Sequence, residues 1–425
     1  MIPDEWKVVR FAEIADYKAG RTPARANPKY WDGAGDGVPW VAISDMTEFG
    51  TVTATKEKIS RAAFEHVFRG QAVRAGTLIM SFKLTIGRVA TLGVDACHNE
   101  AIISIYPKPE VDQRYLGYFL AQVDYDALQD RQVKGNTLNQ EKIDRIEVWL
   151  PPFDEQSSIA NFLDLLRHSI VLQDRALATA EDLKHSAMHE LFTRGLRDEP
   201  QKETEIGPMP ESWNPRTILD LCEIWSGGTP RKSVTEHWNG DIPWVSGKDL
   251  KQSALDDAID HVSAAGVNAG SRLAPAGAVL LLVRGMGLAK DLPVAVINRP
   301  MAFNQDVKAL VSRGQYPGEF LRSAIYAGKE RLLSQIVPSA HGTMTLNLND
   351  VETFTVACPG DPDETKDIVT ILHALDRKIG LHRKKSTVLE ELFEALLHKL
   401  MTGEILVGEL DLSALEPQRM ALAAP

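Results

Sequence analysis

The sequence predicts an α+β protein: two similar mixed α/β domains, each followed by a long helix, with the two helices packed as an antiparallel coiled coil with pseudo-twofold symmetry. Two observations predict this architecture. The 425-residue chain repeats a series of short motifs 204 to 209 residues later, and each series ends in a stripe of apolar residues with helical spacing. The predicted parts are a mixed domain at 1–152, a helix and linker at 153–205, a second mixed domain at 206–360, a second helix at 361–408 and a tail at 409–425.

The repeat runs from the start of each mixed domain to its end. Trp6 corresponds to Trp213, and the turn Gly20-Arg-Thr-Pro23 corresponds to Gly227-Gly-Thr-Pro230. The other matched segments are Trp31-Asp-Gly33 with Trp238-Asn-Gly240, Pro39-Trp-Val41 with Pro243-Trp-Val245, and Thr137-Leu-Asn139 with Thr345-Leu-Asn347. The period is too long for a solenoid unit, so the pattern indicates a duplicated module.

The mixed domains contain short apolar runs that are typical of strands. One such run follows a glycine at 76–81 and at 277–283, and further β-rich runs lie at 101–106 and 306–311. Prolines and glycines separate these runs, as they do between strands and turns. The spacing of apolar residues predicts short helices at 115–129 and 317–333.

The predicted long helices open after Pro151-Pro152 and after Pro359. Asp154-Glu155 and Asp363-Glu364 place carboxylates in the first turn, where the helix dipole favours them. Steps of three and four residues then define the packing stripe, which we assign to Ile159, Leu163, Leu166, Ile170 and Leu177 in the first helix and to Ile368, Leu372, Leu375, Ile379, Leu389, Phe393, Leu396 and Leu400 in the second.

Polar residues interrupt this stripe at Gln173 and Lys184 in the first helix and at His382 and Ser386 in the second. Polar seam positions favour one pairing register over others. A lone helix of about 40 residues, roughly 60 Å long, would leave its apolar stripe exposed to water. We therefore expect the two helices to pack on each other.

The composition is that of a globular protein, with 44% hydrophobic and 25% charged residues. The net charge of −11 lies in the helices and linkers, because residues 1–150 carry 19 basic and 20 acidic side chains and residues 206–360 carry 14 and 15. Each near-neutral domain can therefore present one basic face. Three cysteines, no apolar leader and no run long enough to span a bilayer predict a cytoplasmic protein.

The doubled series of motifs resembles the DNA-specificity subunit of type I restriction–modification systems. The resemblance is carried by Trp6 and Trp213, the two Gly-x-Thr-Pro turns, the Trp-x-Gly and Pro-Trp-Val segments, and the closing Leu400-Met-Thr-Gly403. It implies two target-recognition domains, each followed by a conserved spacer helix. It also implies a non-catalytic subunit that reads one half of a split, asymmetric site in double-stranded DNA with each domain.

The partners that the resemblance implies are two adenine-methyltransferase subunits and, in the full complex, motor-nuclease subunits. S-adenosylmethionine, ATP and Mg are then expected on those partners, with no cofactor in this chain. Two other interpretations of the function stay open. The duplicated domains could form a structural or protein-interaction scaffold, or the chain could be the specificity subunit of a simpler methyltransferase–nuclease system.

Candidate DNA contacts follow from the need for Arg, Lys, Asn or Gln at base edges and for cations at phosphates. The first Gly-x-Thr-Pro loop is basic and contains no acid between Lys18 and Tyr30. The candidates in the first domain are Lys18, Arg21, Thr22, Arg25, Lys29, Lys83, Arg88, Lys134 and Asn136. Those in the second are Thr229, Arg231, Lys232, Arg284, Lys290, His341 and Thr343.

The paired tryptophans could stack on bases, but their matched positions beside apolar residues favour a role as core anchors for Trp31, Trp40, Trp238 and Trp244. No enzyme motif is complete. The nuclease-like Asp363-Glu-Thr-Lys366 is contiguous at a helix start, and Asn27-Pro-Lys-Tyr30 departs from the methyltransferase motif at its third residue. His185 and His189 lack a third ligand, so we predict neither a catalytic residue nor a metal site.

Overall fold

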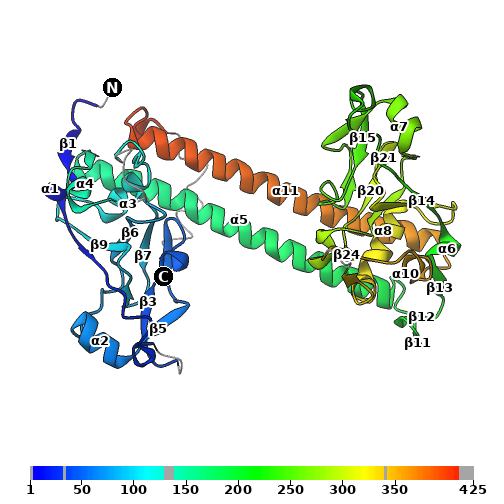
Figure 1. Cartoon of the computed structure of the whole chain (residues 1–425), viewed down its shortest axis with the longest axis horizontal. Helices are drawn as coiled ribbons and strands as arrows, with labels where there is room; N and C mark the ends of the chain where they lie inside the picture. The colour runs from blue at the N-terminus through cyan, green and yellow to red at the C-terminus, as the bar shows by residue number, and fades with distance from the viewer. Residues whose placement is uncertain (1–2, 32–34, 129–137, 339–341, 411–425) are drawn as a thin grey trace. The chain divides into compact units, whose positions relative to one another are not determined.

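The computed structural model describes residues 3–31, 35–128, 138–338 and 342–410 (Figure 1). The chain forms two compact units. The first contains residues 1–174 and 384–425, and the second contains residues 175–383. Each unit therefore includes one mixed domain and one half of each long helix, and each is described by itself below.

The first unit is built on a five-stranded sheet and a smaller three-stranded sheet. Every neighbouring pair in the larger sheet is antiparallel except β4 with β7. Its strand order is β2 (Ala15–Ala19), β9 (Ile102–Pro107), β6 (Leu78–Ser81), β7 (Val89–Leu92) and β4 (Gly50–Val52). The smaller sheet has the order β5 (Glu57–Ile59), β3 (Val38–Val41) and β8 (Cys97–His98), flanked by helix α2 (Arg61–Phe68).

Helix α3 (Gln113–Ala121) packs on β6, β7 and β9 and buries Tyr115 and Leu116 completely. The predicted helix at 115–129 is thus too long at its C-terminal end. Asp124 accepts hydrogen bonds from the backbone N–H groups of Asp126 and Ala127, and this local turn replaces further helix. The unit is completed by β1 (Lys7–Arg10) paired with β10 (Glu147–Leu150), and by the short helices α1 (Phe11–Ile14) and α4 (Gln140–Asp144).

The second unit repeats this plan with the same strand directions. Its five-stranded sheet has the order β14 (Cys222–Ser226), β22 (Val307–Ser312), β19 (Val279–Leu282), β20 (Val294–Ile297) and β16 (Ala254–Leu255). Its smaller sheet has the order β17 (Asp260–Val262), β15 (Ile242–Val245), β21 (Met301–Phe303) and β18 (Leu273–Ala274). Helix α8 (Gly318–Ala327) covers β19 and β20, as α3 covers the first sheet. The predicted helix at 317–333 is interrupted at Gly328, where α9 (Lys329–Leu333) begins.

The remaining elements of the second unit are short. They are the hairpin β11 (Gln201–Thr204) and β12 (Gly207–Pro210), the pair β13 (Asn214–Thr217) and β25 (Thr355–Cys358), the pair β23 (Val337–Pro338) and β24 (Met344–Thr345), and the helices α6 (Ile218–Leu221), α7 (Ala264–Gly270) and α10 (Leu348–Glu352). The shared strand order of the two units confirms the prediction of two similar mixed α/β domains.

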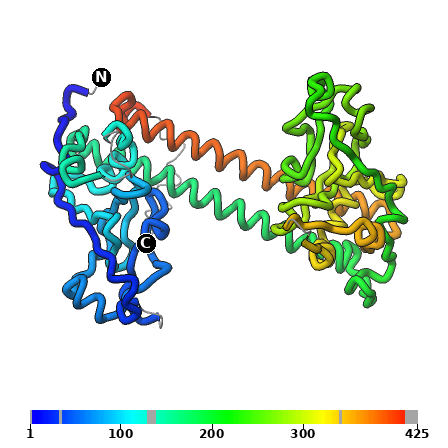
Figure 2. The backbone as a smooth tube through the Cα atoms, viewed as in Figure 1, coloured from blue at the N-terminus to red at the C-terminus, as the bar shows by residue number. Residues whose placement is uncertain are grey.

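The long helices are α5 (Phe153–Arg194) and α11 (Pro362–Met401), and they run antiparallel within each unit (Figure 2). In the first unit, Ile159, Leu163 and Leu166 share one core with Leu397 and Leu400. In the second unit, Met188, Leu191 and Phe192 share a core with Ile368 and Leu372. The predicted antiparallel packing of the two helices is therefore confirmed.

Every residue of the predicted packing stripe is buried or half-buried. Two of the predicted polar seam positions, Gln173 and Ser386, are buried, and the Ser386 hydroxyl donates to Asp174 at 2.6 Å. In the second unit, Lys184 forms an ion pair with Asp376. No helix within the described residues is both long and apolar enough to cross a membrane.

Candidate nucleic-acid interface

The Gly-x-Thr-Pro turns place a loop directly against a strand of the smaller sheet, the edge strand β8 in the first unit and the inner strand β21 in the second. An added Cβ at Gly20 would lie 2.0 Å from the carbonyl oxygen of His98, and one at Gly227 would lie 2.3 Å from that of Phe303. Only glycine permits such a close backbone approach. The repeated glycine therefore sets the position of each loop relative to its sheet.

The matched threonines tie each loop to the segment that follows β8 or β21. The hydroxyl of Thr22 donates to Glu100, and that of Thr229 donates to Gln305 at 2.6 Å. Glu100 and Gln305 are not among the residues predicted from the sequence. Their matched positions after Asn99 and Asn304 are the signal that could have identified them.

This same segment also holds a second loop in each unit. The backbone N–H of Phe82 donates to Ala101, next to Glu100, at 2.9 Å. In the second unit, the N–H groups of Val283 and Arg284 donate to Asp306, next to Gln305, at 2.9 and 3.3 Å. The Gly-x-Thr-Pro loop and the loop carrying Lys83 or Arg284 are therefore anchored to one short segment.

The predicted region around the matched Thr-Leu-Asn segments contacts the loop that carries Lys83 or Arg284. The N–H of Leu138 donates to Phe82 at 3.0 Å, and the N–H of Gly285 donates to Met344 at 2.9 Å, so Arg284 lies beside the segment that begins with Thr343. Lys134, Asn136 and His341 lie outside the described residues. The structure thus brings three predicted regions together in the second unit.

Two predicted arginines of the first loop are held by intramolecular contacts. Arg21 donates to the carbonyl of Val67 at 2.7 Å. Arg25 pairs with Glu57 at 2.9 Å, and its guanidinium lies 3.8 Å above the ring of Trp31. Both arginines fix the loop on the neighbouring β5 and α2 region while their side chains stay exposed.

The other predicted cations differ in how far they are engaged. Arg88 donates to the carbonyls of Ile43 and Met46 and so braces a turn, and Lys83 lies 5.2 Å from the ring of Phe82. Among these other predicted cations, six are exposed and form no ion pair with a described residue: Lys18, Lys29, Arg231, Lys232, Arg284 and Lys290. These six side chains are available to phosphate or base edges.

The tryptophans act as core anchors. Trp40 and Trp244 are 2% and 6% exposed, and their indoles donate to the carbonyls of Arg21 and Gly228, each at 3.0 Å. Trp31 and Trp238 contact them edge-on, with ring centroids 5.1 and 5.0 Å apart. Each indole pair holds its basic loop on the sheet, as the sequence predicts.

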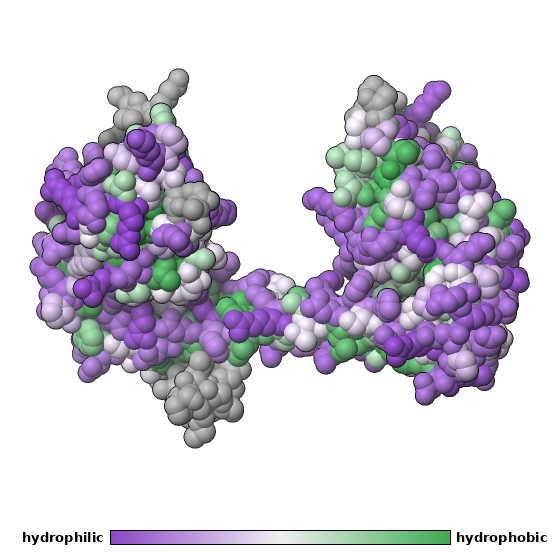
Figure 3. Space-filling model, turned by 90° about the horizontal axis from the view of Figure 1, so that it is seen from below, coloured by the Kyte–Doolittle hydropathy of each residue, from purple (hydrophilic) through white to green (hydrophobic). Residues whose placement is uncertain are grey.

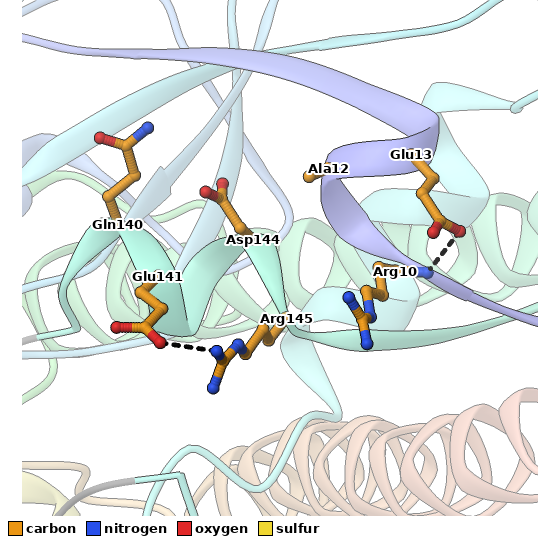
Figure 4. Close-up of a pocket in the computed structure, with 7 residues that line it drawn as sticks. All are labelled: Arg10, Ala12, Glu13, Gln140, Glu141, Asp144 and Arg145. Atoms are coloured by element: carbon orange, nitrogen blue, oxygen red, sulfur yellow. Dashed lines mark hydrogen bonds and ion pairs between the residues drawn. The ribbon is translucent and has the colours of Figure 1, made fainter.

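A polar groove also lies in the first unit, away from the Gly-x-Thr-Pro loop. A groove of about 560 Å³ is lined by Arg10, Glu13, Glu141, Asp144 and Arg145 (Figure 4). Within it, Arg145 pairs with Glu141, Glu13 accepts a hydrogen bond from the backbone N–H of Arg10, and Asp144 accepts one from the Tyr17 hydroxyl. Among the residues that the structure describes, no group of three His, Cys, Asp or Glu side chains could hold a metal ion.

The surfaces of both units that are visible in Figure 3 are mainly hydrophilic, with smaller apolar areas. Some exposed apolar side chains lie on the long helices. They are Val171, Leu172 and Leu183 on α5, and Ile371, Leu381, Val388 and Leu392 on α11.

Known proteins share both the sequence and the fold of this chain. The family described as "Type I restriction modification DNA specificity domain" matches residues 3–180 and again 210–391. The MjaIX type I restriction enzyme specificity subunit of Methanocaldococcus jannaschii is 25% identical over 431 residues, which cover 96% of this chain and 95% of that protein.

Two solved structures share the fold. A chain from a study of complex assembly and conformational transition of the type I R-M system has a TM-score of 0.59 at 17% identity, covering 95% of this chain and all of that one. The S subunit from M. genitalium has a TM-score of 0.55 at 15% identity, covering 94% and 96%.

Proposed function

Because the chain belongs to the type I restriction–modification DNA specificity family, in which recognition of DNA is the shared role, we propose that it is the non-catalytic subunit that reads a split, asymmetric site in double-stranded DNA. One half of the site is read by each mixed domain. The observation that carries this proposal is the anchoring of separate cation-bearing loops to a single segment in each unit, next to Glu100 in one and Gln305 in the other.

Converging loops suit DNA recognition because the contacts that position a protein and those that read bases must be made together. Exposed Lys18 and Lys29 in one unit, and Arg231, Lys232 and Arg284 in the other, supply donors for both kinds of contact. The two loops carry different side chains at matched positions. The two half-sites should therefore differ in sequence.

The long helices are proposed to set the spacing of the half-sites and to dock partner subunits. A continuous helix of 42 residues is about 63 Å long. The exposed apolar side chains of α5 and α11 offer surface for two adenine-methyltransferase subunits, with motor-nuclease subunits added in the full complex. S-adenosylmethionine, ATP and Mg would be bound by those partners, and the assembly would act in the cytoplasm.

The test is methylome sequencing of host DNA with and without the gene. We expect N6-methyladenine in a split motif with an unspecified gap, and we expect the motif to vanish on deletion. Replacing residues 1–150 with those of another subunit should change only one half of the motif. A change in both halves would contradict the assignment of one half to each domain. An unchanged methylome, together with capture of proteins other than methyltransferases, would favour the interaction-scaffold reading.

Two results together would favour a simpler methyltransferase–nuclease system: methylation that depends on this chain, and a purified complex that shows no ATP-dependent cleavage of DNA. The two possibilities differ only in the partners, so the recognition role is tested separately from them.

A further inference from the structure

The second unit contains a charged cavity of about 760 Å³. It lies between α8, the start of β20 and the stretches of α5 and α11 that belong to this unit. A smaller cavity of about 110 Å³ adjoins it and shares Ser253, Arg322 and Asp376 as lining residues. The combined volume falls in the range of small-molecule sites, which is roughly 300–1,000 Å³.

Arg322 of α8 lines both cavities and is only 8% exposed. Its guanidinium lies 4.9 Å from the ring of Tyr326, and its Nε has no hydrogen-bond partner within the described part of the chain. Burial lowers the pKa of this arginine. A buried cation with an unused donor is costly unless an anion accompanies it.

Three of the acidic side chains that line the cavity are engaged with other cations. Asp376 pairs with Lys184, and it also accepts from the Ser253 hydroxyl at 3.4 Å. Glu181 pairs with Arg383 at 2.6 Å, and Asp291 pairs with Lys329 at 2.8 Å. Among the described residues, no carboxylate forms an ion pair with Arg322. The cavity lining as a whole carries four acidic and four Lys or Arg side chains, and among these cations the buried Arg322 forms no ion pair with a described carboxylate.

The duplicated fold shows that this cavity is not required by the architecture. In the first unit, the corresponding space is filled by an aromatic cluster of Phe49, Tyr118 and Phe393, with ring centroids 5.0 to 6.3 Å apart.

In the second unit, the matched positions carry small, polar or charged residues. By the register of β4 on β7 and of β16 on β20, Phe49 corresponds to Gln252, next to Ser253, and by the offsets of the repeat Tyr118 corresponds to Ser323 and Phe393 to Lys184. Arg322 itself corresponds to Gly117 of the first unit. Where the first unit has an aromatic cluster, the second unit thus has smaller or polar side chains and the buried cation Arg322.

We propose that this cavity binds a small molecule through an oxyanion, a carboxylate or a phosphate group, with Arg322 as its principal partner. The planar guanidinium presents donors that match two oxygens of such a group. The ion pairs that surround Arg322 keep their own charges balanced, so they leave its donors for the ligand. The site is independent of DNA recognition.

The experiment is isothermal titration of the full-length protein, without DNA, with inorganic phosphate and with acetate at constant ionic strength. At least one probe should bind saturably, and the one that binds identifies phosphate or carboxylate as the ligand chemistry. Arg322→Met, which keeps the apolar stem, should weaken binding about tenfold or more. Ser253→Phe places an aromatic ring in the lining of both cavities and should also weaken binding while Arg322 is retained.

Arg331→Met is the matched control. Arg331 is also partly buried in the second unit, but it donates to the carbonyl of Thr355 at 2.8 Å and lies over Phe354. It should bind the probes like the unaltered protein. The proposal is overturned if neither probe binds saturably, or if Arg322→Met and Ser253→Phe retain full affinity. Equal weakening in Arg331→Met would also overturn it. If Arg322→Met does not fold, Ser253→Phe decides.

Discussion

Replacing Glu364 should destabilise the second unit far more than replacing Glu155 destabilises the first. Both glutamates lie in the first turn of a long helix, and each accepts the indole N–H of the tryptophan that opens its domain. Glu364 is 2% exposed and accepts two hydrogen bonds, from Trp213 at 3.1 Å and from the backbone of Leu196 at 2.9 Å. Glu155 is half-buried and accepts one from Trp6 at 3.2 Å.

The magnitude follows from the donors left without an acceptor. Glu364→Leu leaves the buried indole N–H of Trp213 and the partly buried backbone N–H of Leu196 without an acceptor, at about 1–3 kcal/mol for a buried group and less for the other, so we expect a loss of about 3 kcal/mol. The contact of Glu364 with the half-exposed Arg197 at 3.9 Å adds little. Glu155→Leu removes a single, partly solvated hydrogen bond and should cost about 1 kcal/mol.

Hydrogen exchange measured by mass spectrometry distinguishes the units, because it reports the opening free energy of each peptide separately. In Glu364→Leu, the peptides around Trp213 and the N-terminal turn of α11 should lose protection, while the core of the first unit keeps it. Equal losses in the two variants, or a loss below about 1 kcal/mol in Glu364→Leu, would refute this reasoning.

Three further predictions concern the recognition loops and pH. Gly227→Ala should weaken DNA binding and destabilise the second unit by about 1–3 kcal/mol, because the added Cβ would lie 2.3 Å from the Phe303 carbonyl oxygen. Fluorescence anisotropy measures the binding and thermal unfolding measures the stability. An unchanged thermal-unfolding midpoint would contradict the prediction. Substituting both Arg231 and Lys232 by Gln should lower the slope of log K for DNA binding against log[salt] by about 2 if both contact phosphate, without changing the unfolding midpoint. Arg25→Gln should also loosen its loop, because Arg25 pairs with Glu57. An unaltered slope in the double variant would exclude phosphate contacts at Arg231 and Lys232. Burial lowers the pKa of His98 from 6.5 to about 4, so the unfolded chain takes up a proton at this histidine before the folded chain does as the pH falls. The free energy of unfolding of the first unit should therefore fall by about 3 kcal/mol between pH 6.5 and pH 4. Denaturant titrations should show a weaker pH dependence of this free energy in His98→Gln, and an equal pH dependence in both proteins would assign it to other groups.

The interior contacts of the recognition loops show where prediction from the sequence ends. Arg21, Arg25 and Lys29 look alike in the sequence, as cations of one acid-free loop. The structure separates them, because Arg21 donates to Val67, 46 residues away, and Arg25 pairs with Glu57, 32 residues away. Charge and spacing within a loop carry no information about partners that the fold brings from elsewhere.

The duplication, the mixed α/β character of each half and the two long helices with their packing stripe could all be predicted from the sequence. These features are readable because strand runs, helical spacing and capping carboxylates are local, and a collinear repeat shows each pattern twice. Three features became visible only in the folded chain. Glu364 bonds to Trp213, 151 residues away, and separate loops share one anchoring segment. An aromatic cluster in one unit is replaced by a charged cavity in the other. The physical reason is that these features depend on contacts between residues far apart in the chain, whose energies act only once the sheets and helices have brought them together.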